Sequence, residues 1–165
     1  MEWTKHILRY IIVMLIQVLL FNNLRFLGVC HPYIYILCLL MMPITLPINI
    51  ELVIGAIVGL IMDIFCNTMG VHMATCVLIM YLRRILIPRL VFEPERLNGT
   101  IDSNSLGIEV FLKYSIILTV IHHSSVMFLS AWSLHHFWWT ILSIIVSSIV
   151  SLSIILLYDR LRVQK

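Results

Sequence analysis

The stretch GAIVGLIMDIF, at residues 55–65, decides how this sequence folds. It is an apolar run that contains two glycines, Gly55 and Gly59, and one acid, Asp63. Residues four apart lie on the same face of an α-helix, so these three residues share one face. Small residues at this spacing let a second helix approach closely within a membrane. The stretch therefore predicts a transmembrane helix over residues 48–66 that packs against a neighbouring helix through this face.

The whole chain is as apolar as this stretch. Of its 165 residues, 61% are hydrophobic and only 12% are charged, whereas a soluble domain carries about 25% charged residues. A spanning helix needs roughly 20 mainly apolar residues. The composition therefore predicts one all-α integral membrane domain over residues 1–165 and excludes a large soluble domain.

Apolar runs that are separated by polar or proline-containing turns predict six transmembrane helices. The second run is short. It lies between Pro32 on one side and Pro43 and Pro47 on the other, and proline interrupts helices. Residues 88–109 are the longest polar stretch and are predicted to form a loop with one short surface helix. The expected spans are residues 7–27, 31–46, 48–66, 71–87, 110–130 and 137–158.

The basic residues predict the orientation in the membrane, because lysine and arginine collect on the cytoplasmic side of short loops. With six spans and a cytoplasmic N-terminus, only Arg25 of the eleven basic residues lies outside. The pattern therefore predicts that both termini are cytoplasmic. The basic residues of the loop after the fourth span either only set this topology or contact anionic membrane lipid and cytoplasmic partners. They are Arg83, Arg84, Arg89 and Arg96.

Asp63 is the most informative single residue, because a charge at the centre of a bilayer costs roughly 2.5–3.5 kcal/mol. Two interpretations stay open. Asp63 accepts hydrogen bonds from a docked helix, or it caps the turn at residues 67–70. His72 opens the next span and is either an interfacial residue or a partner of Asp63 across the hairpin. Both interpretations place six residues in one helix-packing or partner-binding site: Gly55, Gly59, Asp63, Thr68, Gly70 and His72.

Other polar residues point to packing rather than to chemistry. The pairs His122-His123 and His135-His136 have no carboxylate or cysteine at zinc-site spacing, so we expect interhelical hydrogen bonds and no metal or cofactor. A stripe of Ser143, Ser147 and Ser151 suits close helix packing. An intramembrane aspartyl enzyme needs two carboxylates in one site, and Asp63 is the only acid well inside a span. The sequence therefore predicts no catalytic residues.

Residues 28–90 resemble the MreD family of rod-shape-determining membrane proteins. The resemblance rests on PYIYIL at 32–37, on Pro43, on the stretch at 55–65, on NTMGVH at 67–72 and on YLR at 81–83. After residue 90 the similarity lies mainly in the length and the six-span layout. The resemblance also implies a fold similar to the substrate-binding subunits of energy-coupling-factor vitamin transporters.

The resemblance implies a non-enzymatic scaffold in the bacterial inner membrane. Such a protein belongs to the elongation complex for peptidoglycan synthesis and so maintains rod cell shape. Its implied partners are an MreC-type protein, a RodA-type glycosyltransferase, a class B penicillin-binding transpeptidase and MreB-type filaments, with no nucleic acid. Two alternatives stay open: a membrane subunit that binds a vitamin for a transporter, and an intramembrane enzyme that acts on lipid or lipoprotein.

Overall fold

The computed structural model describes residues 2–23, 30–93, 97, 99–131 and 137–163, with side chains except at residues 2–7, 23 and 163. Helices account for most of these residues. They are α1 (Glu2–Leu19), the 3-10 turn η1 (Phe21–Asn23), α2 (Ile36–Leu40), α3 (Ile48–Cys66), α4 (Val71–Leu90), α5 (Ser103–Leu106), α6 (Ile108–Ser130) and α7 (Phe137–Val163).

In the described part of the chain, four helices are long and apolar enough to cross a membrane: α3, α4, α6 and α7. The chain is therefore a multi-pass membrane protein with an all-α fold. The apolar part of α1, Leu8–Leu19, is shorter than a full span. The predicted bounds of α3, α4 and α6 agree closely with the structure, although α4 continues to Leu90 and α6 begins at Ile108. Helix α7 continues beyond its predicted end at residue 158, to Val163. The predicted short surface helix is α5.

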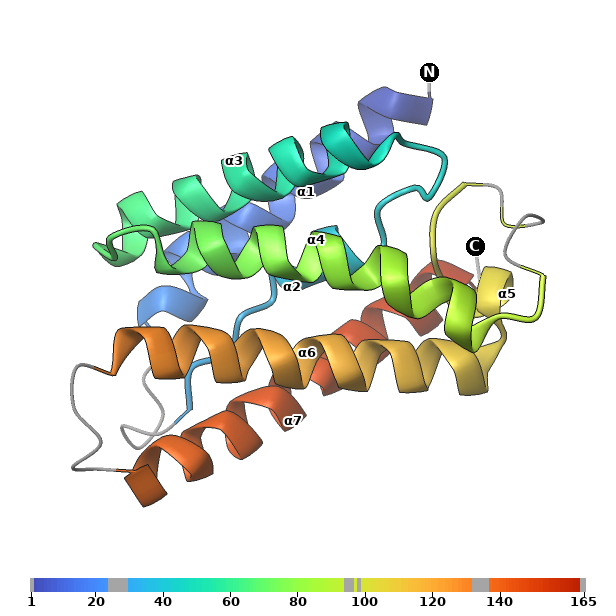
Figure 1. Cartoon of the computed structure of the whole chain (residues 1–165). Coiled ribbons are helices and arrows are strands. Elements are labelled where there is room, and N and C mark those ends of the chain that lie inside the picture. The colour runs from blue at the N-terminus through green and yellow to red at the C-terminus, as the bar shows by residue number, and fades with distance from the viewer. Residues whose placement is uncertain (1, 24–29, 94–96, 98, 132–136, 164–165) are drawn as a thin grey trace.

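The second predicted helix, over residues 31–46, is largely absent, because only the five residues of α2 are helical there. Pro32, Pro43 and Pro47 flank this helix, and each removes a backbone donor that a longer helix needs. Figure 1 shows this segment passing through the middle of the bundle from one end toward the other. We call residues 30–47 the crossing segment. Its centre is buried, from Ile34 to Met42.

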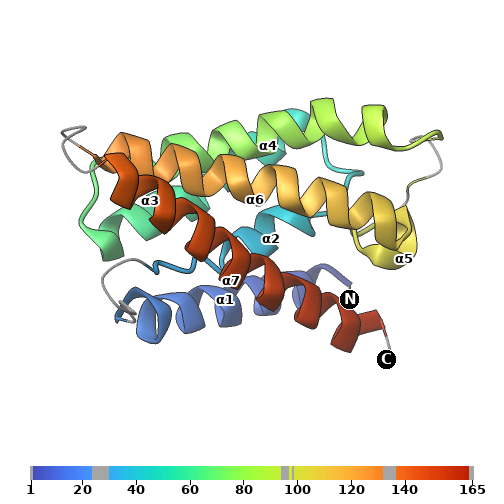
Figure 2. The same ribbon diagram turned by 90° about the horizontal axis from the view of Figure 1, so that it is seen from below.

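The helices run along one common direction, with turns at two ends (Figure 1). Both termini and α5 lie at one end, which we call the terminal end. The α3–α4 turn lies at the opposite end, which we call the hairpin end. Figure 2 shows α2 between α1 on one side and α4 and α6 on the other, and α2 contacts all three of these helices. The core of the molecule is therefore built around the crossing segment.

Candidate functional site: a capped hairpin and a buried polar centre

The glycine face of α3 packs directly on α4. A Cβ atom on Gly59 would lie 2.4 Å from the Cα of Met73 and 2.6 Å from the carbonyl oxygen of His72. A Cβ atom on Gly55 would lie 2.7 Å from the Cγ of Met80 and 3.3 Å from the carbonyl oxygen of Cys76. The neighbouring helix that the glycine spacing predicts is thus α4 of the same chain.

Asp63 caps the N-terminus of α4. Its Oδ1 accepts hydrogen bonds from the Thr68 hydroxyl at 2.5 Å and from the backbone N–H of His72 at 2.9 Å. Its Oδ2 accepts a hydrogen bond from the backbone N–H of Met73 at 2.9 Å. The first N–H groups of a helix have no partner within the helix, and the helix dipole favours a negative charge there. The buried carboxylate therefore finds donors for both of its oxygens, and the N–H groups of His72 and Met73 find the acceptor that the helix itself does not supply.

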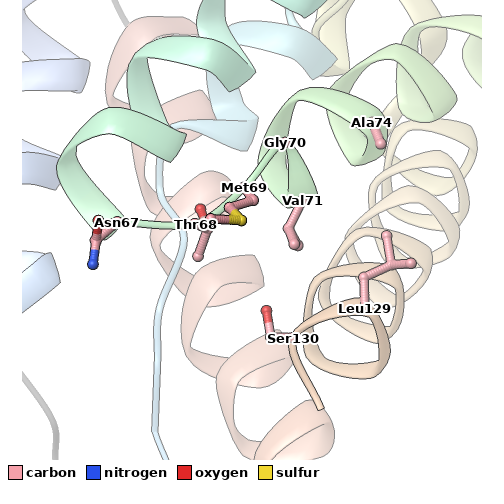
Figure 3. A pocket seen from close by; sticks show the side chains of 8 residues that line it. All are labelled: Asn67, Thr68, Met69, Gly70, Val71, Ala74, Leu129 and Ser130. Atoms are coloured by element: carbon pink, nitrogen blue, oxygen red, sulfur yellow. The ribbon is translucent and has the colours of Figure 1, made fainter. Parts of the chain in front are cut away.

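The turn between α3 and α4 has two residues with positive φ, and both are of types that tolerate it. Asn67 adopts the left-handed conformation with φ of 55°, and Gly70 has φ of 79°. Asparagine and glycine tolerate this region better than other residues do. Figure 3 shows a hollow beside this turn, with Leu129 and Ser130 of α6 on its far side. Its volume is about 520 Å³.

A buried polar centre lies where the crossing segment meets α4 and α6. The Tyr35 hydroxyl is 2.8 Å from Nδ1 of His72 and 2.7 Å from Nε2 of His122. A phenol donates one hydrogen bond and accepts others, so one of the two imidazoles accepts from Tyr35 and the other donates to it. All three side chains are buried. The His72 ring therefore bonds to Tyr35, and only its backbone N–H meets Asp63.

The polar centre continues through His123 to α7. Nδ1 of His123 donates to the carbonyl oxygen of Thr119 at 2.9 Å, which leaves Nε2 to accept from the Ser151 hydroxyl at 3.1 Å. The ring of Tyr33 packs against the imidazoles of His72, His122 and His123, with centroids 5.2–5.7 Å apart. Of the adjacent histidines, His123 makes an interhelical hydrogen bond to α7, whereas His122 bonds to Tyr35 of the crossing segment. Helices α4, α6 and α7 meet at this centre.

Side chains from the surrounding helices satisfy the backbone of the crossing segment. On the side of the hairpin end, Gln17 accepts from the N–H of Ile34 at 2.6 Å, and Ser147 and Ser151 accept from the N–H groups of His31 and Tyr33. Non-helical backbone is tolerated at membrane depth only where protein groups or water satisfy it. The serine stripe therefore binds backbone as well as allowing close packing.

On the side of the terminal end, α4 and α6 supply donors to the carbonyl oxygens at and just after the C-terminus of α2. The Arg83 guanidinium donates to the carbonyl oxygens of Leu39 at 3.1 Å and Met42 at 2.6 Å. The Tyr114 hydroxyl donates to the carbonyl oxygen of Leu40 at 3.0 Å. These groups end α2 in the way that a helix C-cap ends a longer helix.

The predicted basic loop is only partly a loop. Arg83, Arg84 and Arg89 belong to α4, because the helix continues past Pro88. Arg83 is fully buried, and Arg84 forms an ion pair with Glu51 at 3.0 Å and also donates to the carbonyl oxygen of Leu46. Arg89 is exposed, and Arg96 lies outside the described residues. Arg83 is therefore a core residue and has no surface for lipid or a partner.

Sequence reasoning located the hairpin but missed the polar centre. Tyr35 and Gln17 gave no signal as single residues, since each lies in an apolar run. The two residues could have been found only together with the proline-bounded second span. An interrupted helix in a membrane needs polar side chains nearby to bind its backbone. In the described residues, no group of three or more His, Cys, Asp or Glu side chains is arranged to hold a metal ion. The pair His135-His136 lies outside that part of the chain.

A second cavity, of about 400 Å³, lies above the polar centre on the side of the hairpin end. Its polar lining includes Asn22, Tyr33, Thr68 and His72. Comparisons with known proteins give no further assignment for either cavity. No family model matches this chain, and no curated protein and no solved structure matches it either.

Proposed function

We propose that this chain is a non-enzymatic scaffold of the MreD kind in the bacterial cytoplasmic membrane. It would bind an MreC-type protein and so hold the cell-elongation complex for peptidoglycan synthesis together. The observation that carries the proposal is the capped α3–α4 hairpin. It fixes the turn at residues 67–70 in one shape while the Met69 side chain stands 97% exposed. A rigid turn with an exposed apolar side chain is suited to docking a protein partner.

The proposed topology has six crossings, made by α1, the crossing segment, α3, α4, α6 and α7. The start of α1, the end of α4, the start of α6 and the end of α7 all lie at the terminal end (Figure 1). These parts hold Arg9, Arg89, Lys113, Arg160 and Arg162. Because basic residues mark the cytoplasmic side, we place the terminal end in the cytoplasm. The hairpin end then faces the compartment where the cell wall is built.

The buried acids support a role without catalysis. Asp63 caps α4, Glu51 pairs with Arg84, and Asp159 accepts from the backbone N–H of Ser103. Asp63 and Glu51 lie at opposite ends of α3, and Asp159 lies on α7. Each of these acids is bound to a structural partner. An aspartyl hydrolase instead brings two carboxylates together in one site.

Affinity purification tests this proposal. The tagged full chain would be purified from bacterial membranes in mild detergent, and the retained proteins would be identified by mass spectrometry. We expect an MreC-type protein, together with a RodA-type glycosyltransferase and a class B penicillin-binding transpeptidase. MreB-type filaments are expected only when the cytoplasmic contacts survive extraction.

A matched pair of variants locates the docking surface. Met69→Glu places a charge on the hairpin turn, and Phe92→Glu places one on an equally exposed residue just after α4, at the terminal end. We expect Met69→Glu to lower recovery of the MreC-type protein about tenfold, equivalent to about 1.4 kcal/mol, while Phe92→Glu retains it. Equal recovery with both variants would move the docking surface away from the hairpin.

The cavity above the polar centre favours a second candidate, the membrane subunit of a vitamin transporter. Its volume of about 400 Å³ falls within the size range of small-molecule pockets, and its lining combines apolar and polar groups. Equilibrium binding of radiolabelled vitamins to the purified protein tests this function. Recovery of ATPase subunits and a coupling membrane protein in the purification would favour the transporter over the scaffold.

A further inference from the structure

An apolar groove runs along the outside of the bundle between α1 and α7. Its cavity volume is about 560 Å³. One wall includes Arg9, Ile12 and Ile16 of α1, and the opposite side includes Leu37 of the crossing segment with Ile154 and Tyr158 of α7. Figure 2 shows α7 passing beside α1 as both approach the terminal end.

The groove has one charged residue, and that residue lies near its mouth at the terminal end. Arg9 lines the groove with a half-buried side chain, and its enclosed Nη1 has no hydrogen-bond partner among the described residues. A charged guanidinium group in an apolar groove is unfavourable unless an anion or another polar group compensates its charge. The remaining lining is apolar apart from the Tyr158 hydroxyl. The groove therefore calls for a ligand with one anionic end and a long apolar part.

The dimensions of the groove favour an acyl chain over a protein helix. The part of α1 that lines the groove, from Leu8 to Ile16, is about 12 Å long at about 1.5 Å per residue, and one leaflet of a bilayer has about 15 Å of hydrocarbon. A volume of about 560 Å³ over this length gives a mean cross-section of about 47 Å². A helix about 10 Å wide has a cross-section of about 80 Å², so the groove is too narrow to hold one.

We propose that this groove is a binding site for an anionic phospholipid, with one acyl chain along α1 and the phosphate at Arg9. The guanidinium group binds phosphate through two parallel hydrogen bonds, which are stronger than bonds between neutral groups. Arg9 also lies about two turns into α1, and a long arginine side chain can extend from there to the headgroups. The lipid would fill the space between α1 and α7 and so hold α1 against the bundle. This inference requires only the membrane location and is independent of the scaffold function.

The test compares two lipids with the same acyl chains, phosphatidylglycerol and phosphatidylcholine, added to the purified full chain in a neutral detergent. Native mass spectrometry measures the lipid retained, and a thermal melt measures its effect on the fold. We expect phosphatidylglycerol to be retained at one copy per protein and to raise the melting temperature more than phosphatidylcholine does. Equal retention of the two lipids would overturn the proposal, because it would mean an ordinary lipid-facing surface.

Three variants locate the site. Arg9→Gln should weaken phosphatidylglycerol binding about tenfold and remove the preference over phosphatidylcholine. Ile12→Trp should fill the groove and weaken binding of both lipids. Arg160→Gln changes an exposed arginine near the end of α7 that does not line the groove, and it should leave the preference unchanged.

A photo-crosslinking residue at position 12 separates a lipid from a protein occupant in native membranes, and it does not depend on the stability of the Arg9 variant. Crosslinks to phospholipid support the proposal. Crosslinks mainly to another protein would overturn it and assign the groove to a partner. Loss of the phosphatidylglycerol preference in Arg160→Gln as well as in Arg9→Gln would also overturn it, since the effect would then follow net charge.

Discussion

Asp63, in the last turn of α3, accepts a 2.9 Å hydrogen bond from the backbone N–H of His72, in the first turn of α4. The imidazole of the same His72 points the other way and meets the Tyr35 hydroxyl at 2.8 Å. One residue thus connects the hairpin cap to the polar centre. The position of α4 therefore depends on both sets of hydrogen bonds.

Removing the cap should destabilise the protein. Asp63→Ala deletes the acceptor of three hydrogen bonds and leaves the N–H groups of His72 and Met73 unpaired. We expect a loss of about 2–3 kcal/mol in the free energy of unfolding, because the change combines a lost cap with buried donors. Denaturant unfolding in detergent micelles measures it. Glu109→Ala, at an exposed residue, is the control and should change the value by less than about 0.5 kcal/mol. Similar free energies of unfolding for both variants would mean that Asp63 does not stabilise the protein by capping α4.

The two glycines of α3 should differ in their sensitivity to a methyl group. In Gly59→Ala the new Cβ meets backbone atoms of His72 and Met73, so α3 and α4 must move apart. In Gly55→Ala its nearest neighbour is the flexible side chain of Met80, which can move. We expect a loss of about 3 kcal/mol for Gly59→Ala and about 1 kcal/mol for Gly55→Ala, measured by the same unfolding experiment. A larger effect at Gly55 would contradict the packing described for this face.

The Tyr35 hydroxyl should stabilise the polar centre. Tyr35→Phe keeps the ring but leaves Nδ1 of His72 and Nε2 of His122 without their partner. We expect a loss of about 2–4 kcal/mol, since each unpaired buried group costs about 1–3 kcal/mol. The control is Tyr81→Phe, because Tyr81 is 51% exposed on α4. A Tyr35→Phe protein as stable as the Tyr81→Phe protein would mean that water replaces the hydroxyl without loss.

Arg83 and Arg89 should have opposite sensitivities although both are arginines of α4. Arg83→Gln removes the guanidinium that donates to the carbonyl oxygens of Leu39 and Met42. We expect a loss of about 3 kcal/mol, because these buried carbonyls lose charge-assisted bonds. Arg89→Gln, at an exposed position, should change the stability by less than about 0.5 kcal/mol. Denaturant unfolding in detergent micelles measures both values. Equal free energies of unfolding for the two variants would mean that Arg83 does not stabilise the end of α2.

Much of the fold can be predicted from local pattern. The bounds of α3 and the start of α4 follow from apolar runs of helical length and from the turn residues between them, since these signals act within the segment itself. The glycine face of α3 follows from four-residue spacing. The identity of the facing helix does not, because spacing shows that a helix can come close without showing which one does.

The site could be predicted only in part. Asp63 in an apolar run indicated a residue with buried partners, and capping was one of the two open interpretations. Tyr35 could not be found in this way, since its hydrogen bonds reach His72 and His122, which are 37 and 87 positions away. Arg83 was predicted to belong to the basic loop, yet it is buried in the core, because the carbonyl oxygens of Leu39 and Met42 accept hydrogen bonds from its guanidinium group.

The sequence by itself determined that the chain is an all-helical membrane protein with a close-packed hairpin, because apolar length, small-residue spacing and turn residues are local properties. Only the tertiary structure decided what happens at residues 30–47. A proline-bounded apolar segment can form a helix with a kink or an unwound crossing. The choice depends on whether distant side chains can satisfy its backbone. Gln17, Ser147, Ser151 and Arg83 do so here, and they meet that segment only after α1, α4 and α7 have packed around it.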